Sequence, residues 1–262
     1  MSNQEQTLGQ TDQPQTDQPQ AEQGSALKQQ WGKIIALVSI VAIALGSFND
    51  SMDALEKIYD FSLSQFTDIP SQDKLDKVYV RASASVLDEA LGAPVYIKRS
   101  GAGDVIKYYQ DDRFVLSAVI KDEAIAAYLV FPANGFMPDT SKSAGGSDLL
   151  RSHFGNQEDV SDLRAALSRM LTYYIEENTG GEFNTLYNSV SGYSDFETSL
   201  GEQQRAQLGR LVDDMLLGDD VSDAAQTLRH NLTPNFYGYS TIGLSALEDA
   251  ILTKSEFRLI QP

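Results

Sequence analysis

Residues 114–131 read FVLSAVIKDEAIAAYLVF and contain the clearest structural signal in the chain. In each half of this stretch, one set of alternate positions is entirely apolar, and a short polar connection at 121–124 separates the halves. Alternation with a period of two indicates β-strands, and so short a connection joins antiparallel neighbours. The stretch therefore predicts a β-hairpin with strands at 114–120 and 125–131.

The residues before this hairpin extend the same module. A helix is predicted to begin at Ser85 and to end at Gly92, a residue typical of helix C-termini. Strand-like runs at 95–98 and 105–109 follow, joined by short polar connections. Residues 72–132 thus predict an α+β module in which a helix covers one side of a four-stranded antiparallel meander.

Part of this module resembles a known family. The motif Leu91-Gly92-Ala93-Pro94, followed by the strand pair Tyr108-Tyr109, is similar to the helix-plus-hairpin module of the small outer-membrane lipoprotein of the β-barrel assembly machinery. The resemblance covers residues 83–131 and implies that fold for them. The chain has no cysteine, so it lacks the lipidated residue of that family.

The whole chain also resembles a family of uncharacterised bacterial single-span membrane proteins. In that family a Tyr- and Glu-rich segment and a Pro-Asn-aromatic-Gly stretch follow such a module, and their counterparts here are residues 173–177 and 234–238. This resemblance implies a bacterial membrane protein and implies no activity.

The longest apolar run lies at 34–48, reads IIALVSIVAIALGSF and contains no charged residue. Counted from Trp31, the segment 31–48 would form a helix of about 27 Å, near the short end of what crosses a bilayer. Trp31 and Lys33 suit the interfacial region. A buried core helix and a cleavable signal peptide are the alternatives. We expect a single transmembrane helix at 31–48.

The flanks of this run give the expected topology. Residues 1–30 are rich in Gln and Pro, with a tandem repeat at 11–20, and predict a disordered tail. Apolar residues at helical spacing in 49–70 predict a juxtamembrane stalk. Because Lys28 and Lys33 precede the run, the positive-inside rule places the tail in the cytoplasm and the C-terminal domain outside the bacterial inner membrane.

The second half of the chain has a less regular pattern. Residues 133–158 predict a polar loop, and residues 159–262 predict a mixed, mainly helical region. Val160, Leu163 and Leu167 recur at helical spacing. Three further helices are predicted, at 196–217, 221–232 and 245–253. Strand-like runs at 172–175 and 183–190 compete with a helix that continues through Glu177. The expected fold class is therefore α+β, with an N-terminal transmembrane helix, the meander module and a mostly helical C-terminal part.

Composition excludes several functions. The 262 residues include 20 Lys and Arg against 37 Asp and Glu, a net charge of −17, with two His and no Cys. A nucleic-acid partner needs a basic surface, and cysteine-ligated metals and Fe–S clusters need thiolates. We therefore expect no nucleic-acid partner, no metal and no cofactor.

No catalytic residue is predicted. Ser71 and Lys74 have Ser-x-x-Lys spacing, but the partner motifs of that nucleophile are absent. His153 and His230 each lack a Ser or Cys partner marked by any motif. The acidic pair Asp111-Asp112 lacks the pattern of a calcium loop.

Aromatic residues suggest a protein-interaction surface, with core packing as the alternative, because tyrosine is favoured at interfaces. The residues predicted for this surface are Tyr173, Tyr174, Tyr187, Tyr193, Phe236 and Tyr237. The leading hypothesis is a membrane-anchored, non-catalytic interaction or envelope-associated protein. The alternatives are a membrane-tethered hydrolase and a cytoplasm-facing sensor or defence component.

Overall fold

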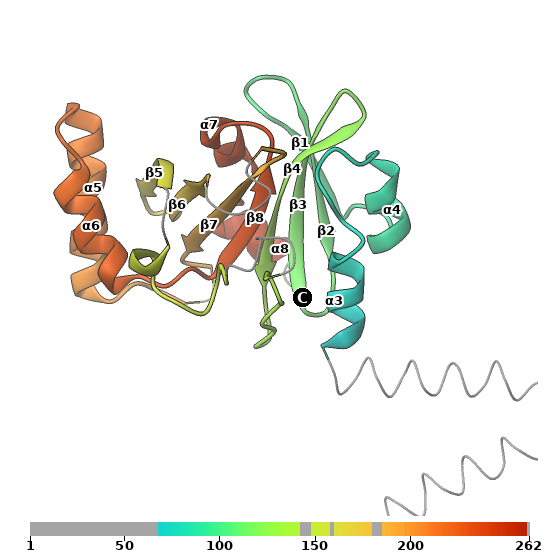
Figure 1. The fold of residues 1–262 in the computed structure, drawn as a ribbon, viewed down its shortest axis with the longest axis horizontal. Coiled ribbons are helices and arrows are strands. Elements are labelled where there is room, and N and C mark those ends of the chain that lie inside the picture. Colours follow the sequence, from blue (N-terminus) through green and yellow to red (C-terminus); the bar gives the residue numbers. More distant parts are fainter. Residues whose placement is uncertain (1–67, 142–147, 158–159, 180–184, 197, 261–262) are drawn as a thin grey trace, which may run out of the picture. The chain divides into compact units, whose positions relative to one another are not determined.

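The hairpin at 114–131 forms the centre of the meander in the computed structural model of the chain. Its strands are β3 (Phe114–Lys121) and β4 (Ala124–Pro132), preceded by α4 (Ser85–Leu91), β1 (Tyr96–Arg99) and β2 (Val105–Gln110). The predicted helix and four strands of this module are confirmed. The structure describes residues 68–141, 148–157, 160–179, 185–196 and 198–260 (Figure 1).

The meander is half of a larger antiparallel sheet. Strand β4 pairs with β8 (Phe236–Ser240), so the sheet continues into the second half of the chain. The strand order is β1-β2-β3-β4-β8-β7-β6-β5. The remaining strands are β5 (Val160–Leu167), β6 (Thr172–Asn178) and β7 (Asn188–Ser194).

The expectation of a mostly helical C-terminal part is wrong, because four of the eight strands come from residues 160–240. The run from Val160 to Leu167 was assigned to a helix by its 3-4 spacing, but it is strand β5. Leu163, Ala165 and Leu167 also alternate with a period of two, and in the structure they pack beneath α5 and α6. In so short a run the same apolar residues fit both a helical and a strand period. The run forms a strand because it pairs with β6.

The transmembrane part of the expected fold class is also corrected. Among the described residues, no helix is long and apolar enough to span a membrane. The predicted tail, span and most of the stalk lie within 1–67, outside the described residues. What the structure contains is an eight-stranded antiparallel sheet accompanied by helices.

Helices cover both faces of this sheet (Figure 1). On one face, α3 (Ile69–Leu75) and α4 cover the meander, while α5 (Glu202–Leu217), α6 (Ser222–Asn231) and the short η1 (Phe154–Asn156) cover strands near β5. On the other face lie α7 (Leu244–Leu247), η2 (Glu248–Ala250) and α8 (Lys254–Ile260). The cross-strand register assigns these faces, because paired residues share a side of the sheet.

The sequence does not predict strand β8. Two glycines, Gly192 and Gly238, allow it to pack between β4 and β7. A Cβ on Gly192 of β7 would overlap the ring of Phe236, and a Cβ on Gly238 would overlap the carbonyl oxygen of Tyr128. The Pro-Asn-aromatic-Gly stretch is therefore a central strand that needs a bare backbone where β4, β7 and β8 meet.

Candidate functional site

Most of the six aromatic residues predicted as an interaction surface are buried. Five are 0–6% exposed, and only Tyr187 is partly exposed, with its ring edge-on to Tyr239 at 5.5 Å. Neighbouring residues in a strand point to opposite faces, which separates Tyr173 from Tyr174 and Phe236 from Tyr237. The five buried rings belong to three hydrophobic clusters and serve as packing.

The Ser71 and Lys74 side chains both bind one carboxylate. The Ser71 hydroxyl donates to Asp111 Oδ1 at 2.6 Å, and Lys74 Nζ lies 2.6 Å from Asp111 Oδ2. Burial raises the pKa of Asp111, but hydrogen bonds from Lys74 and Ser71 outweigh it and hold that pKa below the ordinary 3.8. The bonds from Ser71 and Lys74 to Asp111 therefore connect α3 to the turn between β2 and β3.

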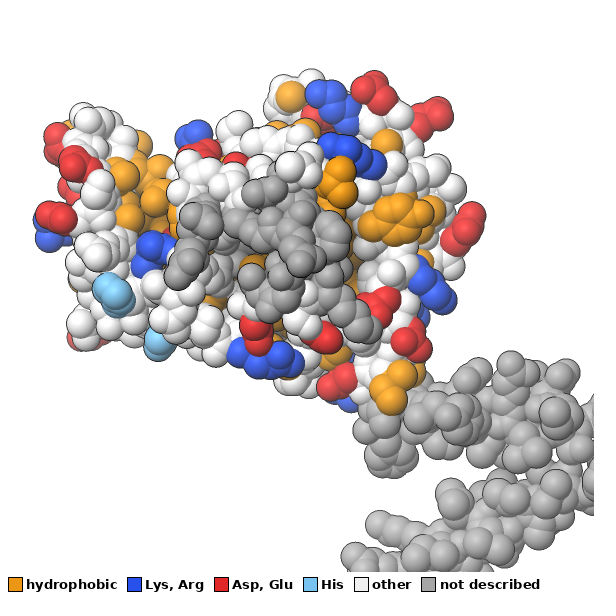
Figure 2. Space-filling view, viewed as in Figure 1, with side chains coloured by type: hydrophobic (Ala, Val, Ile, Leu, Met, Phe, Trp, Pro, Cys, Tyr) orange, Lys and Arg blue, Asp and Glu red, His pale blue; other side chains and the backbone are white. Residues whose placement is uncertain are grey.

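The two histidines lie where η1 meets α6, and Figure 2 shows histidine side chains on the surface. His153 Nδ1 is 2.9 Å from the Thr233 hydroxyl, and His230 lies against the backbone of Gly155. Neither histidine lines the cavity beside Phe131 or the cleft beside Ser240. On the face shown in Figure 2, the acidic and basic side chains of the described residues are interspersed.

A buried ion pair holds this same end of the molecule together. Arg229 Nε lies 2.7 Å from the fully buried Glu176, which also accepts from the Tyr174 hydroxyl. Arg229 Nη2 donates to the carbonyls of Phe154 at 2.9 Å and Gln157 at 2.7 Å. Burial raises the pKa of Glu176 above its ordinary value, against the lowering effects of Tyr174 and Arg229. These contacts join α6, η1 and β6, and their role is structural.

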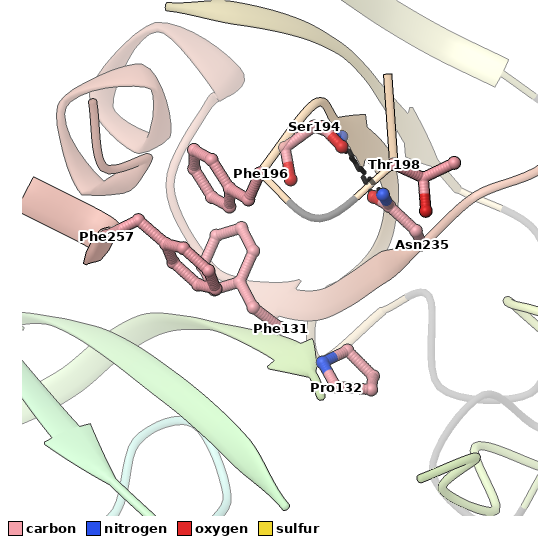
Figure 3. Close-up of a pocket in the computed structure, with 7 residues that line it drawn as sticks. All are labelled: Phe131, Pro132, Ser194, Phe196, Thr198, Asn235 and Phe257. Atoms are coloured by element: carbon pink, nitrogen blue, oxygen red, sulfur yellow. Dashed lines mark hydrogen bonds between the residues drawn. The ribbon is translucent and has the colours of Figure 1, made fainter. Parts of the chain in front are cut away.

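A cavity of about 70 Å³ lies beside Phe131, Phe196 and Phe257 (Figure 3). The rings pack on one another, with centroids 4.4 Å apart for Phe196 and Phe257. The Asn235 amide donates to the Ser194 carbonyl at 2.7 Å and accepts from the Ser194 N–H at 2.9 Å. Because its rings contact each other and its amide is already hydrogen-bonded, this cavity offers little to a ligand.

A larger cavity is an open cleft of about 280 Å³ where β6 and β8 end and β7 begins. The Ser240 hydroxyl donates to the Ile242 carbonyl, and the Thr241 hydroxyl donates to the Ala126 carbonyl at 2.8 Å. Both hydroxyls are thus committed to the backbone. The lining residues are Arg81, Glu177, Thr185, Leu186, Tyr187, Asn188, Ser240, Thr241, Ile242 and Gly243.

Arg81 brings an unpaired positive charge to this cleft. It is exposed, and within the described part of the chain its side chain has neither an ion pair nor a hydrogen bond. Its φ of +69° is left-handed, a conformation that disfavours residues with a Cβ. The Arg81 N–H donates to the Ile125 carbonyl at 2.7 Å, and the Ile125 N–H donates to the Ala82 carbonyl at 2.8 Å. These bonds to β4 hold the backbone in its strained form.

Glu177 brings a negative charge that is nearly buried, with 8% of the residue exposed. Its Oε2 accepts from the Ser161 hydroxyl at 3.2 Å, while Oε1 has no hydrogen-bond partner among the described residues. Arg81 and Glu177 do not pair with each other. A buried carboxylate oxygen without a donor is unfavourable, so this group needs a partner.

The sequence contained only part of the signal for this site. The sequence marks 173–177 as a Tyr- and Glu-rich segment but predicts no role for Glu177. Arg81 lies in no motif, and its left-handed backbone is visible only in the structure. The two residues are far apart in the chain and line one cleft because β4 pairs with β8, β8 with β7 and β7 with β6.

Comparison with known proteins yields no family. No protein-family model matches the chain, and no curated protein matches it. Among solved structures, it is similar to an extracellular protein containing a SCP domain from Bacillus anthracis str. Ames, with 8% identity and a TM-score of 0.32. The match covers 68% of this chain and 49% of the other, so it spans about half of that protein. So low a TM-score carries no argument, and the resemblances drawn from the sequence stay predictions.

Proposed function

We propose that this protein is a non-catalytic binding protein that holds a small charged ligand in the cleft between Arg81 and Glu177. The observation that carries the proposal is that two opposite charges line one cleft and neither is paired with the other. The Arg81 side chain is exposed and open to a ligand, and the nearly buried Glu177 carboxylate lacks a hydrogen-bond donor on one oxygen.

Two energetically unfavourable features at the cleft also support a binding site there. A non-glycine residue in the left-handed region and a buried carboxylate oxygen without a donor are both unfavourable, and such features cluster at functional sites. Here the two lie on one cleft. A ligand that donates to Glu177 would supply the missing donor, and one that accepts from Arg81 would use the side chain that the strained backbone holds at the cleft.

The cleft favours binding over hydrolysis. A serine nucleophile needs a base within hydrogen-bond reach. Ser240 is fully buried and donates to a backbone carbonyl, and neither His153 nor His230 is among the cleft's described lining residues. Binding by the predicted aromatic surface has less support, since five of its six rings are buried.

A ligand screen tests the proposal. The full-length chain would be screened by thermal shift against small polar compounds that include amines, carboxylates, phosphates, sugars, nucleotides and amino acids. The Arg81→Gln/Glu177→Gln double variant should lose the stabilisation by any compound that binds the cleft. The matched control is Arg258→Gln/Glu123→Gln, which makes the same charge changes at exposed positions outside the cleft.

The expected result is at least one compound that stabilises the wild type and the control but not the double variant. If no compound in the screen stabilises the wild type more than the double variant, the proposal is wrong.

A further inference from the structure

We infer that the ligand is zwitterionic and carries an ammonium group for Glu177 and a carboxylate for Arg81, as a free amino acid or a short peptide with free ends does. The inference rests on the proposed function and adds the chemistry of the ligand.

The donor and acceptor properties of the two side chains require opposite groups on the ligand. An ionised carboxylate only accepts hydrogen bonds, so the unpartnered Oε1 of Glu177 needs a donor. A guanidinium only donates, and its planar fork fits a carboxylate with two parallel bonds. An ammonium and a carboxylate on one molecule match both requirements.

A ligand with a single charge can pair with only one of the two charged side chains in the cleft. An inorganic anion would pair with Arg81 but would share the cleft with the Glu177 carboxylate, on a chain whose net charge is already −17. A simple cation would satisfy Glu177 and leave Arg81 unpaired. A zwitterion adds no net charge and leaves neither group alone.

The size of the cleft and its third polar side chain agree with a small ligand of this class. Its volume of about 280 Å³ is just below the range of about 300–1,000 Å³ for sites that hold drug-sized ligands. Asn188 also lines the cleft, and its side-chain amide has no hydrogen bond within the described part of the chain. This amide supplies a donor and an acceptor for a peptide bond or a polar side chain.

Isothermal titration of the full-length protein tests the inference with defined probes, namely the twenty standard amino acids and their glycyl dipeptides. For the tightest binder, the N-acetyl and C-terminal amide derivatives would be measured beside the unblocked compound. Blocking either end should weaken binding about ten- to a hundredfold, as expected for the loss of a charged hydrogen bond.

Variants assign each end of the ligand to its residue. In Arg81→Gln the amide derivative should bind as well as the unblocked compound, while the N-acetyl derivative stays weaker. Glu177→Gln should show the reverse pattern. Binding by amino acids alone identifies a free amino acid as the ligand, and binding by dipeptides alone identifies a peptide end.

The outcome that overturns the inference is distinct from the failure of the proposed function. If the cleft binds compounds of the general screen, but blocking neither end of an amino acid or dipeptide changes affinity, the zwitterion is wrong and the binding function stands. The same holds if none of these forty probes binds the wild type more tightly than the double variant.

Discussion

Replacing Arg81 with glycine should make the protein more stable and abolish ligand binding. Arg81 has a φ of +69°, held by hydrogen bonds between its own segment and β4. Glycine adopts this conformation without steric cost and keeps the backbone donors, so the variant removes the guanidinium and relieves the strain at once.

The magnitude follows from two opposing terms. The left-handed region costs a residue with a Cβ about 1–2 kcal/mol. Glycine loses more conformational freedom on folding, which costs about 0.5–1 kcal/mol. The net gain is about 0–1.5 kcal/mol, equivalent to a rise in Tm of up to about 6 °C for a domain of this size.

Differential scanning calorimetry on full-length wild type and variant measures this change. Glu123→Gly is the matched control, because Glu123 has a φ of +63° in the β3–β4 turn and does not line the cleft. The Glu123→Gly variant should show a similar rise in Tm and should still bind the ligand. Arg81→Ala should lose binding without the gain in Tm, since alanine keeps its Cβ.

The reasoning is refuted if Arg81→Gly unfolds at a lower temperature than wild type while Glu123→Gly unfolds at a higher one. That result would mean that the Arg81 side chain stabilises the fold, and the argument that a strained residue is kept for binding would lose its basis.

Three further predictions concern the framework around the cleft. Gly192→Ala places a methyl group against the ring of Phe236 and should lower the free energy of unfolding in urea by about 3 kcal/mol or more. A loss below about 1 kcal/mol would contradict the close packing of Gly192 against Phe236. Arg229→Met should lower the free energy of unfolding by about 3–5 kcal/mol, because it leaves the buried Glu176 carboxylate without its cationic partner. Adding Glu176→Gln should recover part of this loss, whereas additive losses in the double variant would argue against the ion pair. The pKa of Asp111 is lower in the folded state, so its ionised carboxylate stabilises the fold above the ordinary value of 3.8, and this stabilisation is lost as pH falls through the folded-state value. In urea denaturation, Asp111→Asn should therefore lower the free energy of unfolding at pH ~7 and change it little at pH ~2.

The part of the fold that could be predicted depends on local pattern. Strands β1 to β4 and α4 follow from alternation, short polar turns and a glycine stop, all within about fifty residues. Their bounds lie within a residue or two of those expected. Local sequence is enough where neighbours in the chain are also neighbours in the sheet.

The rest depends on pairing between distant segments. Strand β8 is five residues long with Gly238 at its centre, and it becomes a strand because β4 and β7 lie on either side of it. The run at Val160 fits two periods, and its partner β6 decides between them. The aromatic residues were assigned to a surface because a linear sequence does not show which face of a strand is covered.

The candidate site was beyond sequence reasoning for the same reason. Arg81 lies in a connection between helices, and Glu177 lies one residue before the end of β6, ninety-six residues later in the chain. What distinguishes them is a left-handed backbone, an unpartnered oxygen and a shared cleft, and each of these is a property of the folded chain.

The central claim is that the Arg81–Glu177 cleft binds a zwitterion, and an NMR titration tests it most directly. The ¹⁵N-labelled full-length protein would be titrated with the tightest-binding amino acid or dipeptide. The account predicts saturable shifts of the backbone amides of Arg81, Asn188 and Thr241, and none of these shifts in the Arg81→Gln/Glu177→Gln variant. Saturable shifts confined to Ser194 and other residues of the cavity in Figure 3, or no saturable shift at all, would contradict it.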